Sequence, residues 1–168
     1  PSMHHGILSC LKRFSGNVLQ CELRFVRSSS AALPASLQRQ LEEVFGAPVI
    51  EAYGMTEASH QIVLLSSFSP GKHGPGFVGK PAGTEVAIVD ENGKELHPGE
   101  RGEIVIKGRN VMEGYENNSK ANAESYFGNW FRTGDEGLID DAGHLTLTGR
   151  LKEIINRGGE KVAPSEID

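Results

Sequence analysis

One segment of the sequence, residues 53–57, combines an aromatic ring, a hydroxyl and a carboxylate directly after a short apolar run. In an open α/β sheet, ligands bind beyond the carboxyl ends of the strands, and this segment follows such an end. There Tyr53 could stack on a base, Gly54 could allow close approach of the backbone, and Thr56 could bind a phosphate. Glu57 offers the hard oxygen that Mg²⁺ prefers. The simpler interpretation is a strand-end turn with a surface glutamate.

Two later segments add a carboxylate and a guanidinium. Asp135 lies between Gly134 and Gly137, and a carboxylate on a glycine-flanked turn can accept both hydroxyls of a ribose. The alternative is an aspartate that satisfies its own turn. Arg150 could donate to the same ribose or to a phosphate, or it could be an ordinary surface charge. Each segment is a weak signal by itself, and the combination is a stronger one.

The composition excludes several classes of protein. The 168 residues suffice for one ordinary domain or two small ones. The net charge is -5 and the charges are interspersed, which argues against nucleic acid as a partner. Every apolar run falls short of the roughly 20 residues that a membrane span needs. Cys10 and Cys21 indicate free thiols and the sequence has no signal peptide, so we expect a cytoplasmic or peroxisomal protein that is not secreted.

Residues 1–67 have the pattern of an α/β unit. Pro34 occupies the favoured first position of a helix, and Gly46 is a typical helix terminator. Because the order strand, helix, strand builds parallel sheets, the two strands should pair. The expected elements are a helix from residue 3, a buried strand at 23–26, a helix whose apolar face holds Leu37, Leu41, Val44 and Phe45, and a strand at 49–52.

From about residue 69 the pattern changes to short strands and turns, which is typical of a small antiparallel sheet or barrel. A connector rich in Gly, Pro and Ser, residues 66–83, separates the two regimes. The expected strands are 85–90 and 102–107 around a turn at 91–94, and 138–140 and 144–147 around a turn at 141–143. His4, His5, His73, His97 and His144 are interpreted as unpaired surface or turn residues.

Four motifs, in one order and spacing, resemble those of the adenylate-forming superfamily of acyl-CoA synthetases, luciferases and peptide-synthetase adenylation domains. They are Tyr-Gly-x-Thr-Glu at 53–57, Gly-Glu-Ile-x-Ile-x-Gly at 102–108, Trp-Phe-x-Thr-Gly-Asp at 130–135 and Gly-Arg-x-Lys-Glu at 149–153. The resemblance implies an α/β plus β fold. Its parts would be the end of an α/β nucleotide-binding subdomain (1–67), a β-barrel-like subdomain (68–148), and the hinge and start of a C-terminal lid domain (149–168). The motif at 102–108 is expected to be structural.

The resemblance also implies roles for the matching residues. Tyr53 would stack on adenine, Thr56 would contact the α-phosphate and Glu57 would hold Mg²⁺. Asp135 and Arg150 would bind the ribose hydroxyls. The other predicted site residues are Ser30, Ala31 and Ala32 beside the adenine and acyl groups, Lys152 as the hinge of the lid, and Gly158 and Gly159 on the path of coenzyme A. ATP, Mg²⁺ and coenzyme A are the implied cofactors.

The wording of three runs, LRFVRSSSAAL, LEEVFGAPVIEAYGMTEASH and INRGGEKVAPSEID, resembles the oxalate-type acyl-CoA synthetases. His60 and Ser30 would border the acyl pocket, where an imidazolium and a hydroxyl suit a second carboxylate better than an apolar tail. For His60, the alternative is a polar residue bonded to backbone. The hypothesis is a ligase for a small dicarboxylate such as oxalate, and the alternative is a coumarate-like or medium-chain acyl-CoA synthetase. A peptide-synthetase domain is less favoured, because those usually carry Asp where this chain has Lys152.

The phosphate loop and the distal catalytic lysine of the superfamily are not found in the sequence, which has no Gly-x-x-x-x-Gly-Lys-[Ser/Thr] loop. We therefore expect the 168 residues to be an internal piece of a longer enzyme and to be inactive alone. A non-catalytic piece with at most weak nucleotide binding stays an alternative. A remnant parallel sheet would expose edges and apolar faces, so self-association is also expected.

Overall fold

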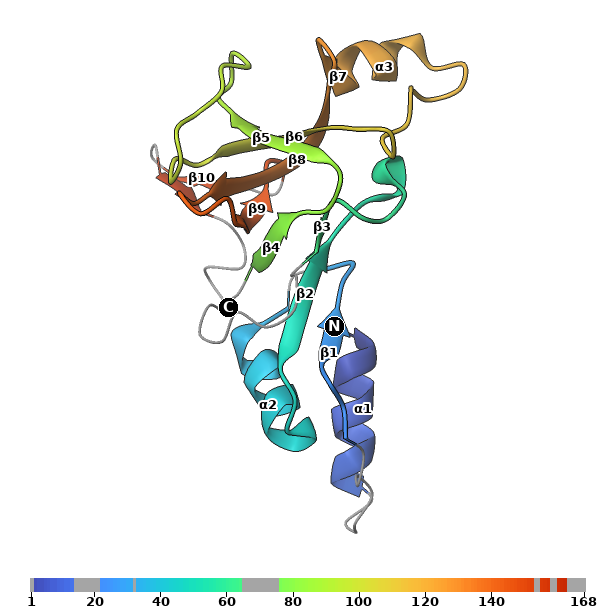
Figure 1. The fold of residues 1–168 in the computed structure, drawn as a ribbon, viewed down its shortest axis with the longest axis vertical. Helices are drawn as coiled ribbons and strands as arrows, with labels where there is room; N and C mark the ends of the chain where they lie inside the picture. The colour runs from blue at the N-terminus through green and yellow to red at the C-terminus, as the bar shows by residue number, and fades with distance from the viewer. Residues whose placement is uncertain are drawn as a thin grey trace.

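The computed structural model describes residues 2–13, 22–31, 33–64, 76–152, 155–157 and 160–162, and it shows two parts joined by one sheet (Figure 1). Within these residues the sheet order is β1-β2-β3-β4-β9-β8-β6-β5, and β7 pairs with β8. The strands are β1 (Val26–Ser28), β2 (Val49–Tyr53), β3 (Val63–Leu64), β4 (Phe77–Pro81), β5 (Glu85–Val89), β6 (Gly102–Lys107), β7 (Tyr126–Phe127), β8 (Trp130–Ile139) and β9 (Leu145–Arg150). A separate two-stranded antiparallel sheet and the helices complete the described elements: β10 (Ile155–Arg157), β11 (Glu160–Val162), α1 (Ser2–Arg13), α2 (Ala35–Phe45), the 3₁₀ turn η1 (Thr56–Ala58) and α3 (Ser119–Ser125).

In the lower part of Figure 1, α2 connects the parallel strands β1 and β2, as the strand–helix–strand pattern predicts. Leu37 and Leu41 of α2 are fully buried and pack with Leu8 of α1. Gly46 ends the helix with the left-handed φ of 60°, which confirms the predicted C-terminus. Val44 differs from the expectation: it lies in the last turn of α2, outside this cluster, and 43% of it is exposed.

The predicted strand at 23–26 is wrong in position. β1 begins only at Val26, and the two large apolar side chains before it, Leu23 and Phe25, are exposed. Val26 pairs with the first residue of β2, so an earlier β1 residue would have to pair with Pro48. Proline has no N–H to donate to a ladder, and the parallel pairing therefore starts one residue later.

The end of β2 joins the parallel pair to an antiparallel sheet. β3 pairs antiparallel with both β2 and β4, and β4 pairs with β9. β4 lies inside the expected connector, residues 66–83, so that segment is not wholly irregular. The sequence of β4, FVGKP, lacks a strand pattern because Gly79 and Pro81 interrupt it, and its pairing is supplied by its neighbours. Val78 nevertheless is almost fully buried.

In the upper part, β5 pairs with β6 and β8 pairs with β9, as the turn signals predict. The largest described apolar cluster lies where the two parts meet, and it consists of Tyr53, Ala58, Ile62, Val63, Val78, Ile88, Ile104, Ile106, Phe131 and Leu145. Strands of both parts thus share one core. The domain boundaries at residues 67 and 148 stay predictions. His144 was expected to be unpaired, but its turn brings Nδ1 within 3.2 Å of both carboxylate oxygens of Asp140.

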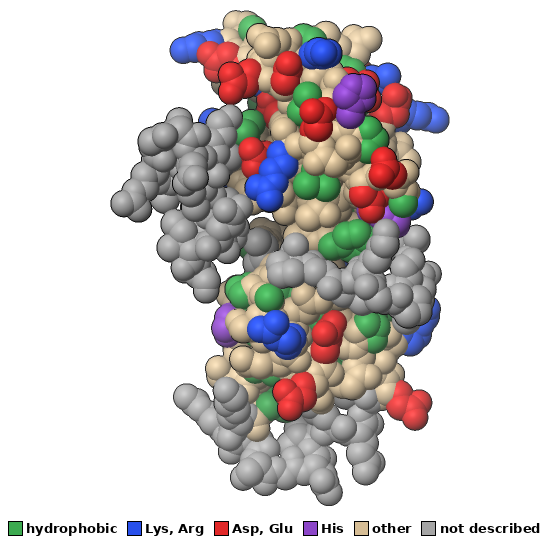
Figure 2. Space-filling model, turned by 90° about the vertical axis from the view of Figure 1, so that its left-hand side faces the viewer, with side chains coloured by type: hydrophobic (Ala, Val, Ile, Leu, Met, Phe, Trp, Pro, Cys, Tyr) green, Lys and Arg blue, Asp and Glu red, His purple; other side chains and the backbone are tan. Residues whose placement is uncertain are grey.

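On the face shown in Figure 2, acidic and basic side chains are interspersed over the upper part of the molecule, in agreement with the sequence. Cys10 is a free and exposed thiol. Among the described residues, no helix combines the length and the apolar character required to cross a membrane.

Candidate functional site

The structure brings together three residues that the sequence places far apart. The hydroxyl of Tyr53, at the end of β2, donates to Asp135 Oδ2 over 2.7 Å. Arg150 Nε lies 2.9 Å from Asp135 Oδ1, because β8 and β9 pair with Asp135 opposite Arg150. The Asp135 side chain is 9% exposed, whereas the Arg150 side chain is 62% exposed. Each carboxylate oxygen keeps capacity for a second donor, so the group can still accept ligand hydroxyls.

Asp135 lies within a strand and not on the turn that the sequence suggested. Val105 of β6 pairs with Arg132 and Glu103 pairs with Glu136, so Ile104 alone faces residues 133–135. This bulge requires a left-handed residue, which Gly134 supplies with φ 72°. A bulge redirects side chains locally, and here it aims Asp135 toward β2 and β9.

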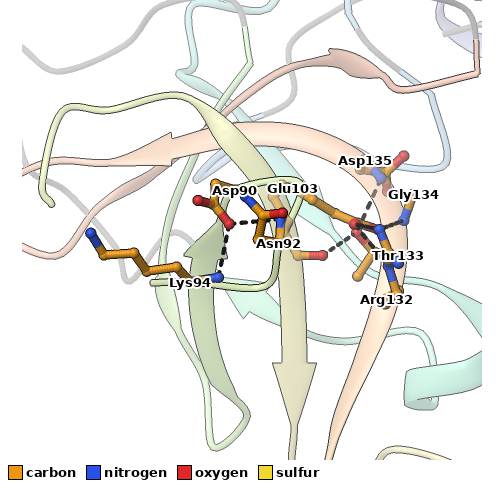
Figure 3. Close-up of polar contacts among 9 residues, drawn as sticks. Asp90, Asn92, Lys94, Glu103, Arg132, Thr133, Gly134 and Asp135 are labelled. Carbon is orange, nitrogen blue, oxygen red and sulfur yellow. Dashed lines mark hydrogen bonds and ion pairs between the residues drawn. The ribbon is translucent and has the colours of Figure 1, made fainter. Parts of the chain in front are cut away.

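A second carboxylate braces the bulge (Figure 3). Glu103, 6% exposed, accepts two hydrogen bonds from Arg132, at 2.9 and 2.6 Å, and a longer one from Gly134 N at 3.3 Å. Thr133 Oγ1 donates to Ile104 O over 2.7 Å and accepts from Asp135 N. The motif at 102–108 therefore contributes a brace, which agrees with the structural role expected from the sequence.

The Tyr53 side chain is buried, in contrast to an exposed ring that could stack on a base at the surface. Only 8% of it is exposed, and its pKa is raised because burial and the neighbouring Asp135 charge both oppose ionisation. The phenol therefore stays a neutral donor to the carboxylate. Stacking of Tyr53 on adenine stays a prediction.

Gly54 has a clear structural requirement. A Cβ at this position would collide with the carbonyl group of His60 and would lie 2.8 Å from Gln61 N. The close approach expected of Gly54 is thus made to the following loop, residues 55–61. Met55 O accepts hydrogen bonds from both Ala58 N, at 3.1 Å, and His60 N, at 2.8 Å, which closes that loop.

Glu57 lies in this loop, in η1, and one of its oxygens is already oriented. Tyr115 Oη donates to Glu57 Oε1 over 2.9 Å, and Met112 N donates to the Glu57 backbone carbonyl over 2.8 Å. The pKa of Tyr115 is raised by desolvation and by the bond to Glu57, so the phenol remains the donor. The described residues contain no cluster of three potential metal ligands. A single carboxylate fits Mg²⁺ that arrives on a substrate phosphate.

The remaining predicted residues lie around these two centres. Thr56 and His60 are exposed in the loop after β2, and Ser30 and Ala31 are exposed in the loop after β1. Because β1 and β2 are parallel, both loops follow carboxyl ends at the same edge of the sheet. Lys152 is exposed in the turn after β9. Ala32, Gly158 and Gly159 lie outside the described residues.

Two candidate functional residues, Asn110 and Tyr115, were not predicted from the sequence. Asn110 donates to carbonyls of the loop after β2, and Tyr115 orients Glu57. Their pairing partners are about 50 residues earlier in the sequence, so no local pattern identifies them. The Gly114-Tyr115 pair after the motif at 102–108 was the available signal.

The fold is of the α/β plus β class, and the end of β2 meets a carboxylate on a bulged antiparallel strand. The family model described as "AMP-binding enzyme" matches residues 1–116. The chain belongs to this family.

Two curated relatives with about half of their aligned residues identical to this chain are named oxalate–CoA ligases. The oxalate–CoA ligase of Saccharomyces cerevisiae is 53% identical over 148 residues, which are 87% of this chain and 27% of that protein. The oxalate–CoA ligase of Arabidopsis thaliana is 51% identical over 147 residues, 88% of this chain and 29% of that protein. The chain thus spans less than a third of the length of these relatives.

A solved structure gives the same fold. The O-succinylbenzoate coenzyme A synthetase of Bacillus subtilis, in complex with ATP and magnesium ion, matches with a TM-score of 0.79 at 35% identity. The match covers 99% of this chain and 34% of that protein.

Proposed function

We propose that the protein containing this chain is an AMP-forming acid:CoA ligase. The proposal rests on the contacts of Tyr53 and Arg150 with the buried Asp135, which join the loop end of β2 to β8 and β9. It offers a carboxylate for ribose hydroxyls, held in place by one neutral donor and one cation. The family match and the named ligases support the same activity.

The proposed reaction has two steps. The substrate carboxylate attacks the α-phosphate of ATP to give acyl-AMP and pyrophosphate, and the thiol of coenzyme A then attacks the acyl-AMP. Asp135 and Arg150 hold the ribose, Tyr53 stacks on adenine, and Thr56 binds the α-phosphate. Ser30, Ala31 and Ala32 would line the adenine and acyl groups. In the second step, Lys152 would serve as the hinge, and Gly158 and Gly159 would leave room for the pantetheine.

Glu57 is proposed to hold Mg²⁺ through the oxygen that Tyr115 leaves free. Bound Mg²⁺ would neutralise phosphate charge during adenylation. The residues of this chain orient the ligand: Tyr115 fixes the carboxylate, and Met112 N fixes the backbone beneath it.

We propose a small dicarboxylate, such as oxalate, as the acid. His60 and Ser30 are exposed at the same sheet edge, and both can donate to a second carboxylate. The two relatives named oxalate–CoA ligase support this choice. A coumarate-like or medium-chain acid is the competing substrate class.

The acid is tested in the full-length protein. Adenylation is measured by pyrophosphate release with oxalate, malonate, coumarate and octanoate, in the wild type and in His60→Ala. We expect oxalate to be preferred and its kcat/KM to fall in the variant by roughly 10-fold or more, as for loss of a charge-assisted hydrogen bond. Preference for octanoate, or unchanged oxalate turnover in His60→Ala, contradicts the dicarboxylate assignment.

The nucleotide site can be tested separately in the 168-residue chain. AMP and MgATP are titrated by calorimetry into the wild type and into Asp135→Ala. Binding that the variant loses supports a residual adenylate site. Equal binding in both proteins contradicts the role of Asp135, and no binding in either favours a non-catalytic piece.

A further inference from the structure

We propose that Asn110 is a positioning residue that sets the place of His60 and thereby the binding of the acid. The inference rests on the proposed function. It concerns the segment after β6, residues 108–112, which follows the motif at 102–108 and contacts the loop after β2.

The Asn110 side chain spans two parts of the molecule. Its Nδ2 donates to Ala58 O at 3.1 Å and to Gln61 O at 2.9 Å, while Oδ1 accepts from Thr84 Oγ1 at 3.0 Å. Only an amide NH₂ can donate to two carbonyls while its oxygen accepts from a hydroxyl, so the chemistry fixes the orientation of the group. Asn110 is half-buried and Thr84 is 3% exposed.

The carbonyls of Ala58 and Gln61 lie on either side of two residues with an unfavourable backbone conformation. Ser59 and His60 lie between them, and both have the left-handed conformation, with φ 52° and 61°. A left-handed residue that is not glycine costs about 1–2 kcal/mol, so the surrounding contacts must hold it. The Asn110 amide ties the residues on either side of this pair, and Ser59 Oγ donates to the Asn110 carbonyl at 3.2 Å.

The same contacts connect the acid side to the β-sheet. Thr84 directly precedes β5. The hydrogen bonds of Asn110 to Thr84 and to the loop after β2 therefore set the position of His60 relative to the upper sheet. Gly108 keeps this arrangement open, because a Cβ there would lie 2.8 Å from Asn110 Oδ1. Glu57 is held by other donors, Met112 N and Tyr115 Oη. Loss of the Asn110 amide should therefore displace His60 more than it displaces Glu57, the carboxylate proposed to hold Mg²⁺.

The test uses Asn110→Asp, which keeps the oxygen that accepts from Thr84 and removes both donors to the loop. Asn129→Asp, at an exposed residue of the turn between β7 and β8, is the matched control for the added charge. In the full-length protein we expect Asn110→Asp to lower kcat/KM for the preferred acid by roughly 10- to 100-fold, mainly through KM, because a small misplacement of a binding group has effects of this size. The KM for MgATP should change less than the KM for the acid.

A second measurement distinguishes a local change in the loop after β2 from a general loss of folding. Amide hydrogen exchange of residues 56–62 in the 168-residue chain should become faster in Asn110→Asp, while exchange in β5 and β6 stays unchanged. Equal acid KM values in wild type and Asn110→Asp, or equal losses toward acid and MgATP, overturn the inference. The proposed function fails by a different result, namely that the wild-type full-length protein forms no acyl-adenylate with any acid.

Discussion

Tyr53 and Asp135 are 82 positions apart in sequence, yet the phenol donates to the carboxylate over 2.7 Å in a buried contact. β2 and β8 are not neighbours in the sheet, so this bond is a direct tie between the lower and upper parts of the molecule. It also keeps a buried carboxylate paired, which is the condition for retaining such a charge at low cost.

Replacing Tyr53 by phenylalanine should destabilise the protein by about 1–3 kcal/mol, since Asp135 would lose a donor while staying buried. Urea unfolding of wild type and variant measures the difference. Tyr115→Phe is the matched control, because its phenol bond is exposed and should contribute much less. Equal losses of stability in the two variants would show that the buried Tyr53–Asp135 bond contributes no more than the exposed Tyr115–Glu57 bond.

Glu103 and Glu85 form a second matched pair. Glu103→Gln removes the charge that holds Arg132 and should cost about 1–3 kcal/mol, because Glu103 is buried. Glu85→Gln weakens an exposed ion pair to Lys107 and should cost about 0–1 kcal/mol. Thermal unfolding of both variants provides the comparison. A larger loss for Glu85→Gln would contradict the role of Glu103 as a brace.

Tyr115→Phe should weaken metal binding without loss of stability. The variant leaves Glu57 in place but removes the donor that orients Oε1. Loss of an outer partner of a metal ligand typically lowers metal affinity by about 10- to 100-fold. Titration of the full-length protein with Mn²⁺ in the presence of ATP, followed by electron paramagnetic resonance, measures the affinity directly. An unchanged Mn²⁺ affinity would argue against Tyr115 as a partner of Glu57.

Glu51, in β2, should make stability depend on pH. Its carboxylate accepts from Leu33 N and Gly76 N, both at 3.0 Å, but burial is the larger effect and raises its pKa above the ordinary 4.5. The folded state therefore binds the proton more tightly than the unfolded state. The stabilisation is complete below about pH 4.5 and is lost as pH rises through the raised pKa.

Glu51→Gln removes this titration, so the stability difference between wild type and variant should change as the pH rises above about 4.5. Urea unfolding across this range measures it. The stability of the variant relative to the wild type should rise with pH, because only the wild type loses stability as Glu51 ionises. A pH-independent difference would show that the Glu51 carboxyl has the same pKa in both states.

The 168-residue chain should self-associate through its lower part. β1 is the terminal strand of the described sheet, and Met3 and Ile7 of α1 are 79% and 45% exposed. Light scattering should show dimers or larger species at high concentration, and Ile7→Glu should reduce them. Phe127→Glu, at an exposed apolar residue of the upper part, is the control. A monodisperse monomer at high concentration would contradict the prediction.

Much of the fold could be predicted because local signals agree with the final structure. Gly46 ends α2, the turn at 91–94 returns the chain, and residues 102–107 form β6. β4 could not be predicted, because its own pattern is interrupted and its neighbours supply the pairing. The start of β1 was misplaced because it depends on Pro48, the residue before β2, which no local window includes.

The sequence by itself determined the motifs, and through them the identity of Asp135, Arg150 and Glu57 as candidates, because residue type and spacing are local properties. Only the tertiary structure decided how they are held. The bulge at Gly134 depends on β6, and the contacts of Tyr115 and Asn110 depend on loops more than 45 residues away. Long-range contacts of this kind form where strands pair and a common core closes, so they are properties of the packed sheet and not of any segment.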